Sequence, residues 1–212
     1  MAYSDSMIFD GADRAKHLLV LAHGAGAPMD SPFMAAFAVG LAGNGIRVAR
    51  FEFPYMQRRR AEGTRRPPDR GPKLEAAWHD VVTEMRATLP DKAKIVIGGK
   101  SMGGRIASMI AQDAEVDGLV CLGYPFHPPG KPEKTRTDHL AALKTPSLMV
   151  QGTRDALGTF DDVQAYKLSP AISVHWLEDG DHSFKPRKSS GRTEQQNWEE
   201  GIAAVADFVA AL

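Results

Sequence analysis

A single serine lies within a glycine-rich pentapeptide, Gly-Lys-Ser-Met-Gly, at positions 99–103. An apolar run, residues 95–97, comes directly before it, and a helical stretch begins near Arg105. A strand, a sharp turn of small residues and a helix form the layout of a nucleophile elbow, in which a strained turn raises the serine hydroxyl above the sheet edge. We therefore predict that Ser101 is a nucleophile. The competing interpretation is an ordinary turn whose serine caps the helix.

A serine hydroxyl needs a base to take its proton and a carboxylate to orient that base. His182 is the best placed of the seven histidines, because it lies in a turn directly after the last predicted strand. Asp155 follows the preceding predicted strand, so we predict it as the acid, with Asp161 or Asp162 as the alternative. Serine, aspartate and histidine then occur in the chain order used by α/β-hydrolase sites.

Two backbone N–H groups must also hold the oxyanion that forms on an attacked carbonyl. The amide of Met102, next after the serine, is one expected donor. The other is expected from the glycine-rich turn that begins at His23, where Ala25 is the first choice and Gly24 and Gly26 are its rivals. We expect His23 to orient this loop rather than to transfer protons.

The elements that must position these residues are predicted to be parallel strands joined by helices. The predicted strands are nearly continuous apolar runs, typical of a sheet covered on both faces. They are His17–Ala22, Ile46–Phe53, Lys94–Gly98, Gly118–Gly123, Ser147–Gly152 and Ser173–Leu177. Apolar stripes at helical spacing run from Leu74 to Leu89 and from Trp198 to Leu212. We expect one domain over residues 1–212, an α/β doubly wound, mostly parallel sheet flanked by helices on both faces.

Two segments are predicted to be irregular. Residues 126–138 form a Pro/Lys-rich stretch that is too short for a helical cap domain, so we expect an open site. Residues 55–73 are rich in Arg, Pro and Gly. This basic stretch is either a solvated loop, which we favour, or a rim that attracts anionic substrates. Lys100, Tyr55 and Arg58 are the candidate residues for a substrate rim.

Composition excludes several other classes of function. Lys and Arg together equal Asp and Glu, so the net charge gives no reason to expect nucleic acid or an anionic membrane as a partner. The one cysteine, Cys121, excludes an internal disulfide and is expected to be a buried, inert thiol. With no apolar leader in the first thirteen residues, we expect a cytoplasmic protein.

No metal and no cofactor are expected either. The remaining histidines lack the spacing of metal ligands. The Gly-Lys-Ser sequence imitates the end of a phosphate-binding loop, but Lys94 stands where that loop requires its first glycine. A small acyl compound is the expected partner, and nothing in the sequence specifies an oligomeric state.

Four motifs together resemble a known family. They are His-Gly-Ala-Gly-Ala at 23–27, Phe-Glu-Phe-Pro-Tyr at 51–55, Arg-Arg-Pro-Pro-Asp at 65–69 and Gly-Lys-Ser-Met-Gly-Gly-Arg at 99–105. From His17 to Leu212 the chain resembles the α/β-hydrolase superfamily. More narrowly, it resembles a small lidless family near the dienelactone hydrolases. That family includes testis-expressed hydrolase-like proteins and the hydrolase-like domain of a chromatin-associated NSL complex subunit.

The resemblance implies a minimal α/β-hydrolase fold and a serine-hydrolase site at Ser101, Asp155 and His182. It implies no particular substrate, because some members of the family are regarded as scaffold components. Lys100 departs from the commonest elbow, where many hydrolases place a neutral or aromatic residue. We therefore expect a serine hydrolase of the carboxylesterase or thioesterase kind. The alternative is an idle, hydrolase-like binding or scaffold module.

Overall fold

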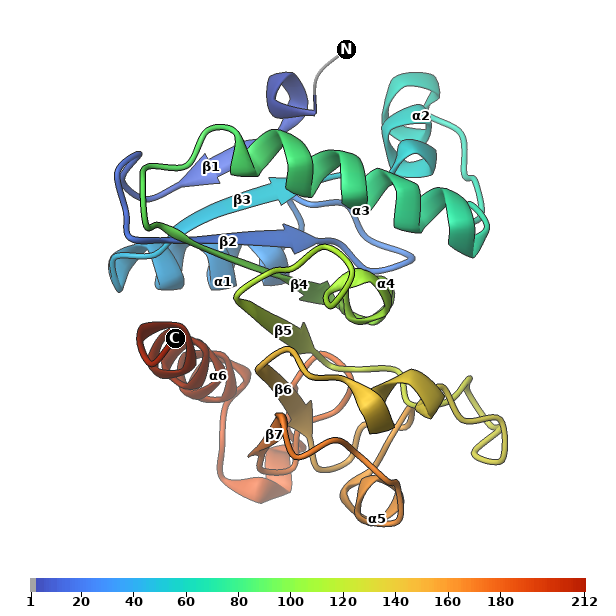
Figure 1. The fold of residues 1–212 in the computed structure, drawn as a ribbon. Coiled ribbons are helices and arrows are strands. Elements are labelled where there is room, and N and C mark those ends of the chain that lie inside the picture. The colour runs from blue at the N-terminus through green and yellow to red at the C-terminus, as the bar shows by residue number, and fades with distance from the viewer. Residues whose placement is uncertain (1–2) are drawn as a thin grey trace.

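A computed structural model describes residues 3–212 as one twisted sheet with helices on both faces (Figure 1). The described strands are β1 (Ile8–Asp10), β2 (His17–Ala22), β3 (Arg47–Phe51), β4 (Lys94–Lys100), β5 (Gly118–Leu122), β6 (Ser147–Gly152) and β7 (Ile172–Leu177). The described α-helices are α1 (Pro32–Gly43), α2 (Pro54–Glu62), α3 (Gly71–Arg86), α4 (Met102–Ile110), α5 (Phe160–Gln164) and α6 (Glu194–Ala210). Short 3₁₀ helices occupy Ser4–Ser6, Asp138–Ala142 and Lys188–Ser190.

The strand order is β1-β3-β2-β4-β5-β6-β7. Every neighbouring pair is parallel except β1 with β3, where Ile8 pairs with Arg50 in antiparallel register. The carboxyl ends of β2 to β7 therefore lie along one edge of the sheet, which is where sites in open α/β sheets are built. The predicted α/β class and mostly parallel sheet are confirmed.

Two apolar layers hold the sheet between them. Alternate residues of a strand point to opposite faces, so Leu19 and Leu21 of β2 pack in the layer of α1 and α6. Leu18 and Val20 pack in the other layer, with α3 and α4 (Figure 1). Both layers are fully buried along β2, which explains why this strand is apolar throughout.

The six predicted strands are confirmed, with ends that differ by no more than two residues. Two other expectations are corrected. Strand β1 was not predicted, because a three-residue edge strand carries almost no periodic signal. Residues 55–73 are not irregular throughout, since helix α2 occupies their first half. Pro54 starts that helix, Tyr55 and Met56 bury its apolar side, and Gly63 ends it at a φ of 65°.

The predicted absence of a helical cap agrees with the structure of residues 3–212. The segment 126–137, between β5 and the following 3₁₀ helix, contains neither helix nor strand. Within residues 3–212, no helix is long and apolar enough to cross a membrane.

Candidate active site

Ser101 occupies the tight turn between β4 and α4. Its backbone has φ 51° and ψ −115°, outside the regions that non-glycine residues favour. The turn is held from both sides, because the Ser101 N–H donates to the carbonyl of Leu122 at 3.0 Å and its own carbonyl accepts from the N–H of Arg105 at 3.0 Å. The Ser101 side chain makes no capping hydrogen bond to the helix. The geometry is therefore that of an elbow and not of a helix cap.

A hydrogen-bonded chain joins Ser101 to His182 and Asp155. Oγ of Ser101 lies 2.9 Å from Nε2 of His182, and Nδ1 of the same ring lies 2.8 Å from Oδ2 of Asp155. The three residues follow β4, β7 and β6, at the shared carboxyl edge of the sheet. Although Ser101 and His182 are 81 positions apart in the sequence, the sheet brings their side chains into contact.

Asp155 is fully buried and its carboxylate is satisfied on both oxygens. Nε2 of Gln151 donates to Oδ2 at 2.9 Å, and the N–H of Leu157 donates to Oδ1 at 2.9 Å. An ionised carboxylate only accepts hydrogen bonds, so the shared proton with His182 belongs to Nδ1 of the imidazole. Nε2 of His182 is then free to accept the proton of the Ser101 hydroxyl.

The alternative acids lie elsewhere. Asp162 belongs to a capping box at the start of α5, where its carboxylate accepts from the N–H and hydroxyl of Thr159 at 3.0 and 2.7 Å. Asp161 is exposed on the same short helix. Of the three aspartates considered, the structure places only Asp155 against His182.

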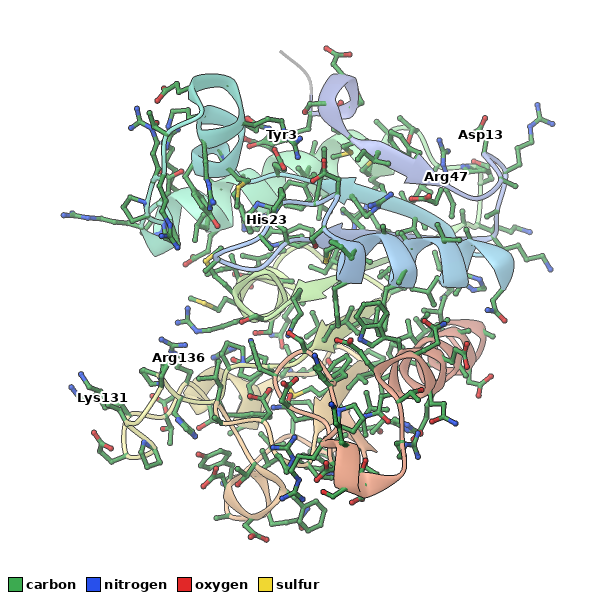
Figure 2. The ribbon with its side chains drawn as sticks, turned by 180° about the vertical axis from the view of Figure 1, so that it is seen from behind. Tyr3, Asp13, His23, Arg47, Lys131 and Arg136 are labelled. Carbon is green, nitrogen blue, oxygen red and sulfur yellow. The ribbon has the colours of Figure 1, made fainter. Side chains whose placement is uncertain are left out.

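His23 orients the glycine-rich turn after β2, as expected (Figure 2). The N–H of Phe53 donates to Nε2 of His23 at 3.2 Å, so the ring proton lies on Nδ1 and is donated to the carbonyl of Gly24 at 2.6 Å. Burial lowers the pKa of His23, which keeps the ring neutral. Because the peptide is trans and planar, fixing the Gly24 carbonyl toward His23 turns the Ala25 N–H the other way.

The amides of Ala25 and Met102 are both available to a ligand. Neither N–H donates to an acceptor within residues 3–212, and both residues line a cavity of about 360 Å³ beside Ser101. Met102 is the first residue of α4, where the helix has no internal acceptor for the N–H. Gly26 does not line this cavity. This arrangement can offer two converging donors to an oxyanion.

None of the three residues predicted for the rim lines the cavity at Ser101. Tyr55 is fully buried in α2 and donates its hydroxyl to the carbonyl of Ala25 at 3.0 Å, so it supports the turn from behind. Arg58 forms an ion pair with Asp69 at 2.7 Å. The polar residues that line the cavity besides Ser101 are Asp69, Arg105 and Arg136.

Lys100 turns away from the cavity and holds the loop that carries His182. Its ammonium donates to the main-chain carbonyl of His182. It also lies over the rings of Phe33 and Phe184, at 5.2 and 5.5 Å from their centroids. A cation that binds a carbonyl and two aromatic faces is well suited to fix the position of a loop. Lys100 therefore positions His182 through its backbone.

The pH dependence of stability should report on this partly buried ammonium. Burial lowers the pKa of Lys100 from its ordinary 10.5 to about 8, and the carboxylates of Asp155 and Asp181 oppose that shift. Between pH 8 and 10.5 the unfolded chain binds more protons than the folded one, so the free energy of unfolding should rise with pH in this window. In Lys100→Met this contribution is absent.

Urea unfolding of both proteins across that window measures the effect. The difference in unfolding free energy, wild type minus Lys100→Met, should increase with pH. Lys131→Met, which removes an exposed lysine, should show no such pH-dependent difference. Identical pH profiles for wild type and Lys100→Met would contradict the burial of a charged Lys100.

Other reactive side chains lie outside the site. Cys121 is fully buried in β5, and burial raises the pKa of its thiol, so it is held in the unreactive protonated form. Within residues 3–212 no group of three or more His, Cys, Asp or Glu side chains is arranged to hold a metal ion.

Sequence reasoning missed three residues of the site. Gln151 orients Asp155, and Arg105 and Arg136 line the cavity. The sequence could have indicated Arg105, because it lies one helical turn after Ser101. No sequence pattern indicated Arg136, because only the folded loop brings it to the cavity.

The fold agrees with comparisons to known proteins. The profile of the alpha/beta hydrolase domain family matches residues 15–210, so the chain belongs to the α/β-hydrolase family. A carboxymethylenebutenolidase of Pseudomonas sp. strain P51 is 33% identical over 116 residues. That match covers 50% of this chain and 46% of the relative, so it spans about half of each protein. The narrower resemblance to testis-expressed and NSL-complex proteins stays a prediction.

Solved structures show the same fold. An alpha-beta serine hydrolase homologue from Coxiella burnetii aligns with a TM-score of 0.70 at 18% identity, covering 94% of this chain and 90% of that one. A lidless serine hydrolase from Xanthomonas campestris aligns with a TM-score of 0.68 at 19% identity, covering 94% and 88%. An esterase from Pyrococcus furiosus aligns with a TM-score of 0.69 at 16% identity, covering 94% and 83%.

Proposed function

We propose that this protein is a serine hydrolase that cleaves an ester, thioester or related acyl bond through an acyl-enzyme. The observation that carries the proposal is the unbroken chain from Ser101 through His182 to the buried Asp155, next to a cavity with two free amides. Family membership, the carboxymethylenebutenolidase relative and the structurally similar esterase support hydrolysis as the reaction.

In the acylation step, Oγ of Ser101 forms a bond to the substrate carbonyl carbon while its proton passes to Nε2 of His182. The carbonyl oxygen becomes an oxyanion, which the amides of Ala25 and Met102 bind. When the tetrahedral intermediate collapses, the bond to the leaving oxygen or sulfur breaks and His182 returns the proton to that atom. Asp155 holds the ring and stabilises its transient positive charge.

In the deacylation step, water takes the place of the leaving group. His182 removes a proton from the water, whose oxygen attacks the acyl carbon. The bond between that carbon and Oγ of Ser101 then breaks, and Oγ takes the proton back from His182. The acid is released and the enzyme is restored. The cavity is not covered by a cap in the described part of the chain, which favours small substrates that enter from solvent.

A fluorophosphonate probe tests the proposal directly. Oγ of an activated serine attacks the phosphorus and displaces fluoride, which leaves a covalent label. The wild type should be labelled, Ser101→Ala should lose all labelling, and Ser183→Ala, which removes an exposed serine beside His182, should label like the wild type. Equal labelling of wild type and Ser101→Ala would refute the nucleophile. A wild type that neither labels nor hydrolyses aryl esters would instead support the idle binding module.

A further inference from the structure

Two arginines face the cavity at Ser101 without an acidic partner. Arg105 and Arg136 both line it, and neither forms an ion pair with any carboxylate in residues 3–212. In the basic stretch, Arg58, Arg60 and Arg66 each bind a nearby Asp or Glu. The other arginines of that stretch do not line this cavity. Arg105 and Arg136 therefore place free positive charge in the lining of the cavity beside Ser101.

Arg105 is fixed at one helical turn from the nucleophile. Its N–H donates to the carbonyl of Ser101 at 3.0 Å, so the two side chains project from the same side of the start of α4. Nε of Arg105 is buried and has no hydrogen-bond partner. A buried donor without an acceptor is costly, so this Nε is available to an acceptor that enters the cavity.

Arg136 is held in place by a buried aromatic hydroxyl. Its N–H donates to the carbonyl of Phe126 at 2.7 Å, and the hydroxyl of the buried Tyr124 donates to its carbonyl at 2.9 Å. Figure 2 shows Arg136 on the same loop as Lys131. Burial, and next the positive charge of Arg105, lower the pKa of Arg136. Placing two like charges together without a partner is unfavourable unless an anion joins them.

The remaining charge in the cavity does not neutralise these arginines. Asp69 also lines the cavity, but its Oδ1 is bound by Arg58 at 2.7 Å and by Lys73 at 3.3 Å. These two cations, which lie outside the cavity lining, offset its charge, while Oδ2 is buried and has no hydrogen-bond partner in residues 3–212. The lining of the cavity carries a net positive charge beside a serine that is hydrogen-bonded to a base.

We propose that Arg105 and Arg136 form an anion-binding subsite that selects acyl substrates with a carboxylate close to the scissile carbonyl. Arginine suits this role because its planar fork of donors matches the two oxygens of a carboxylate. The proposal rests on the proposed hydrolase function and names its substrate class.

Matched pairs of 4-nitrophenyl esters test the subsite. The half-esters of glutaric and adipic acid carry a carboxylate where 4-nitrophenyl pentanoate and hexanoate carry a methyl group, and the reacting bond is the same. 4-Acetoxybenzoate against phenyl acetate places the charge on the leaving group instead. Rates are corrected for uncatalysed hydrolysis. The wild type should show a kcat/KM about tenfold or more higher for the charged member of at least one pair.

Arginine variants test whether the preference for charged esters depends on Arg105 and Arg136. Arg105→Gln and Arg136→Gln should each lower kcat/KM for the preferred charged ester about tenfold, and the double variant about 100-fold, with little change for its neutral partner. Arg65→Gln is the matched control. It removes the same charge from an exposed position outside this cavity and should leave the preference intact. Arg136→Lys should recover part of the preference, because it keeps the charge and loses the fork.

Two results would overturn the subsite. One is a wild type that hydrolyses neutral esters with no preference for any of the three charged esters. The other is an equal loss of preference in Arg65→Gln and in the double variant, which would assign it to general surface charge. Failure of the proposed hydrolase function would look different, because neither charged nor neutral esters would then be cleaved and the fluorophosphonate would not label Ser101.

Discussion

Replacing Asp155 by asparagine is expected to lower kcat by about three to four orders of magnitude while the protein still folds. The proposed reaction passes through a positively charged His182, and the buried carboxylate 2.8 Å from Nδ1 is the negative charge that stabilises it. An amide of the same shape removes that charge. In low-dielectric surroundings the loss is large, because little water is present to compensate.

The side-chain amide of an asparagine at position 155 also cannot satisfy its hydrogen bonds in either orientation. Oδ1 of Asp155 faces the N–H of Leu157, and Oδ2 faces Nε2 of Gln151. An asparagine NH₂ group must therefore point at another donor in either orientation. We expect a stability loss of about 1 to 3 kcal/mol from the opposed donors, in addition to the loss of activity.

Steady-state hydrolysis of a 4-nitrophenyl ester and urea unfolding measure the two effects separately. Asp161→Asn is the matched control, because Asp161 is exposed on α5 and is one of the alternative acids considered from the sequence. It should keep both activity and stability close to those of the wild type. If Asp161→Asn were the inactive variant and Asp155→Asn the active one, the assignment of the acid would be wrong.

Gly103→Ala is expected to destabilise the protein by about 3 kcal/mol or more. A Cβ at this position would lie 2.5 Å from the carbonyl oxygen of Ala22 and 2.6 Å from that of His23. Both contacts are with backbone atoms, which cannot rotate away as a flexible side chain would. The start of α4 or the end of β2 must therefore shift, and that shift also moves the turn that carries Ala25.

Gly43→Ala is also a glycine-to-alanine substitution, but it is expected to stabilise the protein. Gly43 is the last residue of α1, and a Cβ there meets no atom within 4 Å. Alanine should stabilise the helix by about 0.5 kcal/mol, because it restricts the unfolded chain more than glycine does. Thermal unfolding of both variants checks the pair. A Gly103→Ala protein as stable as the wild type would show that α4 and β2 are not packed as closely as the structure has them.

The sheet and the positions of its site residues could be predicted because apolar strands recur along the sequence and each site residue follows one of them. Six strands are apolar runs, and residues that follow parallel strands must meet at one edge. This rule was enough to propose Ser101, Asp155 and His182, which the structure joins by hydrogen bonds. Their catalytic roles remain a prediction for the probe and the variants to test.

The direction of individual side chains could not be predicted in the same way. Lys100 is the last residue of β4, next to Ser101, and the sequence does not specify which face of the sheet its long side chain covers. The structure places it against Phe33 and Phe184, which come from distant elements. Arg136 reaches the cavity only because Tyr124 and Phe126 fix the path of an irregular loop. Such contacts depend on tertiary packing, which local sequence patterns do not encode.

The strand order has a consequence for how activity can appear during folding. Ser101 belongs to the middle of the sheet, whereas His182 follows β7, the edge strand, and depends on it for its position. Ser101 and its turn are held by β2, β4 and β5, whereas the contact with His182 requires β7 to be in place. A partly folded chain can therefore hold the elbow with no base beside it. The proposed hydrolysis therefore requires the completed sheet, and a nascent or damaged chain that lacks its last strand should not carry it out.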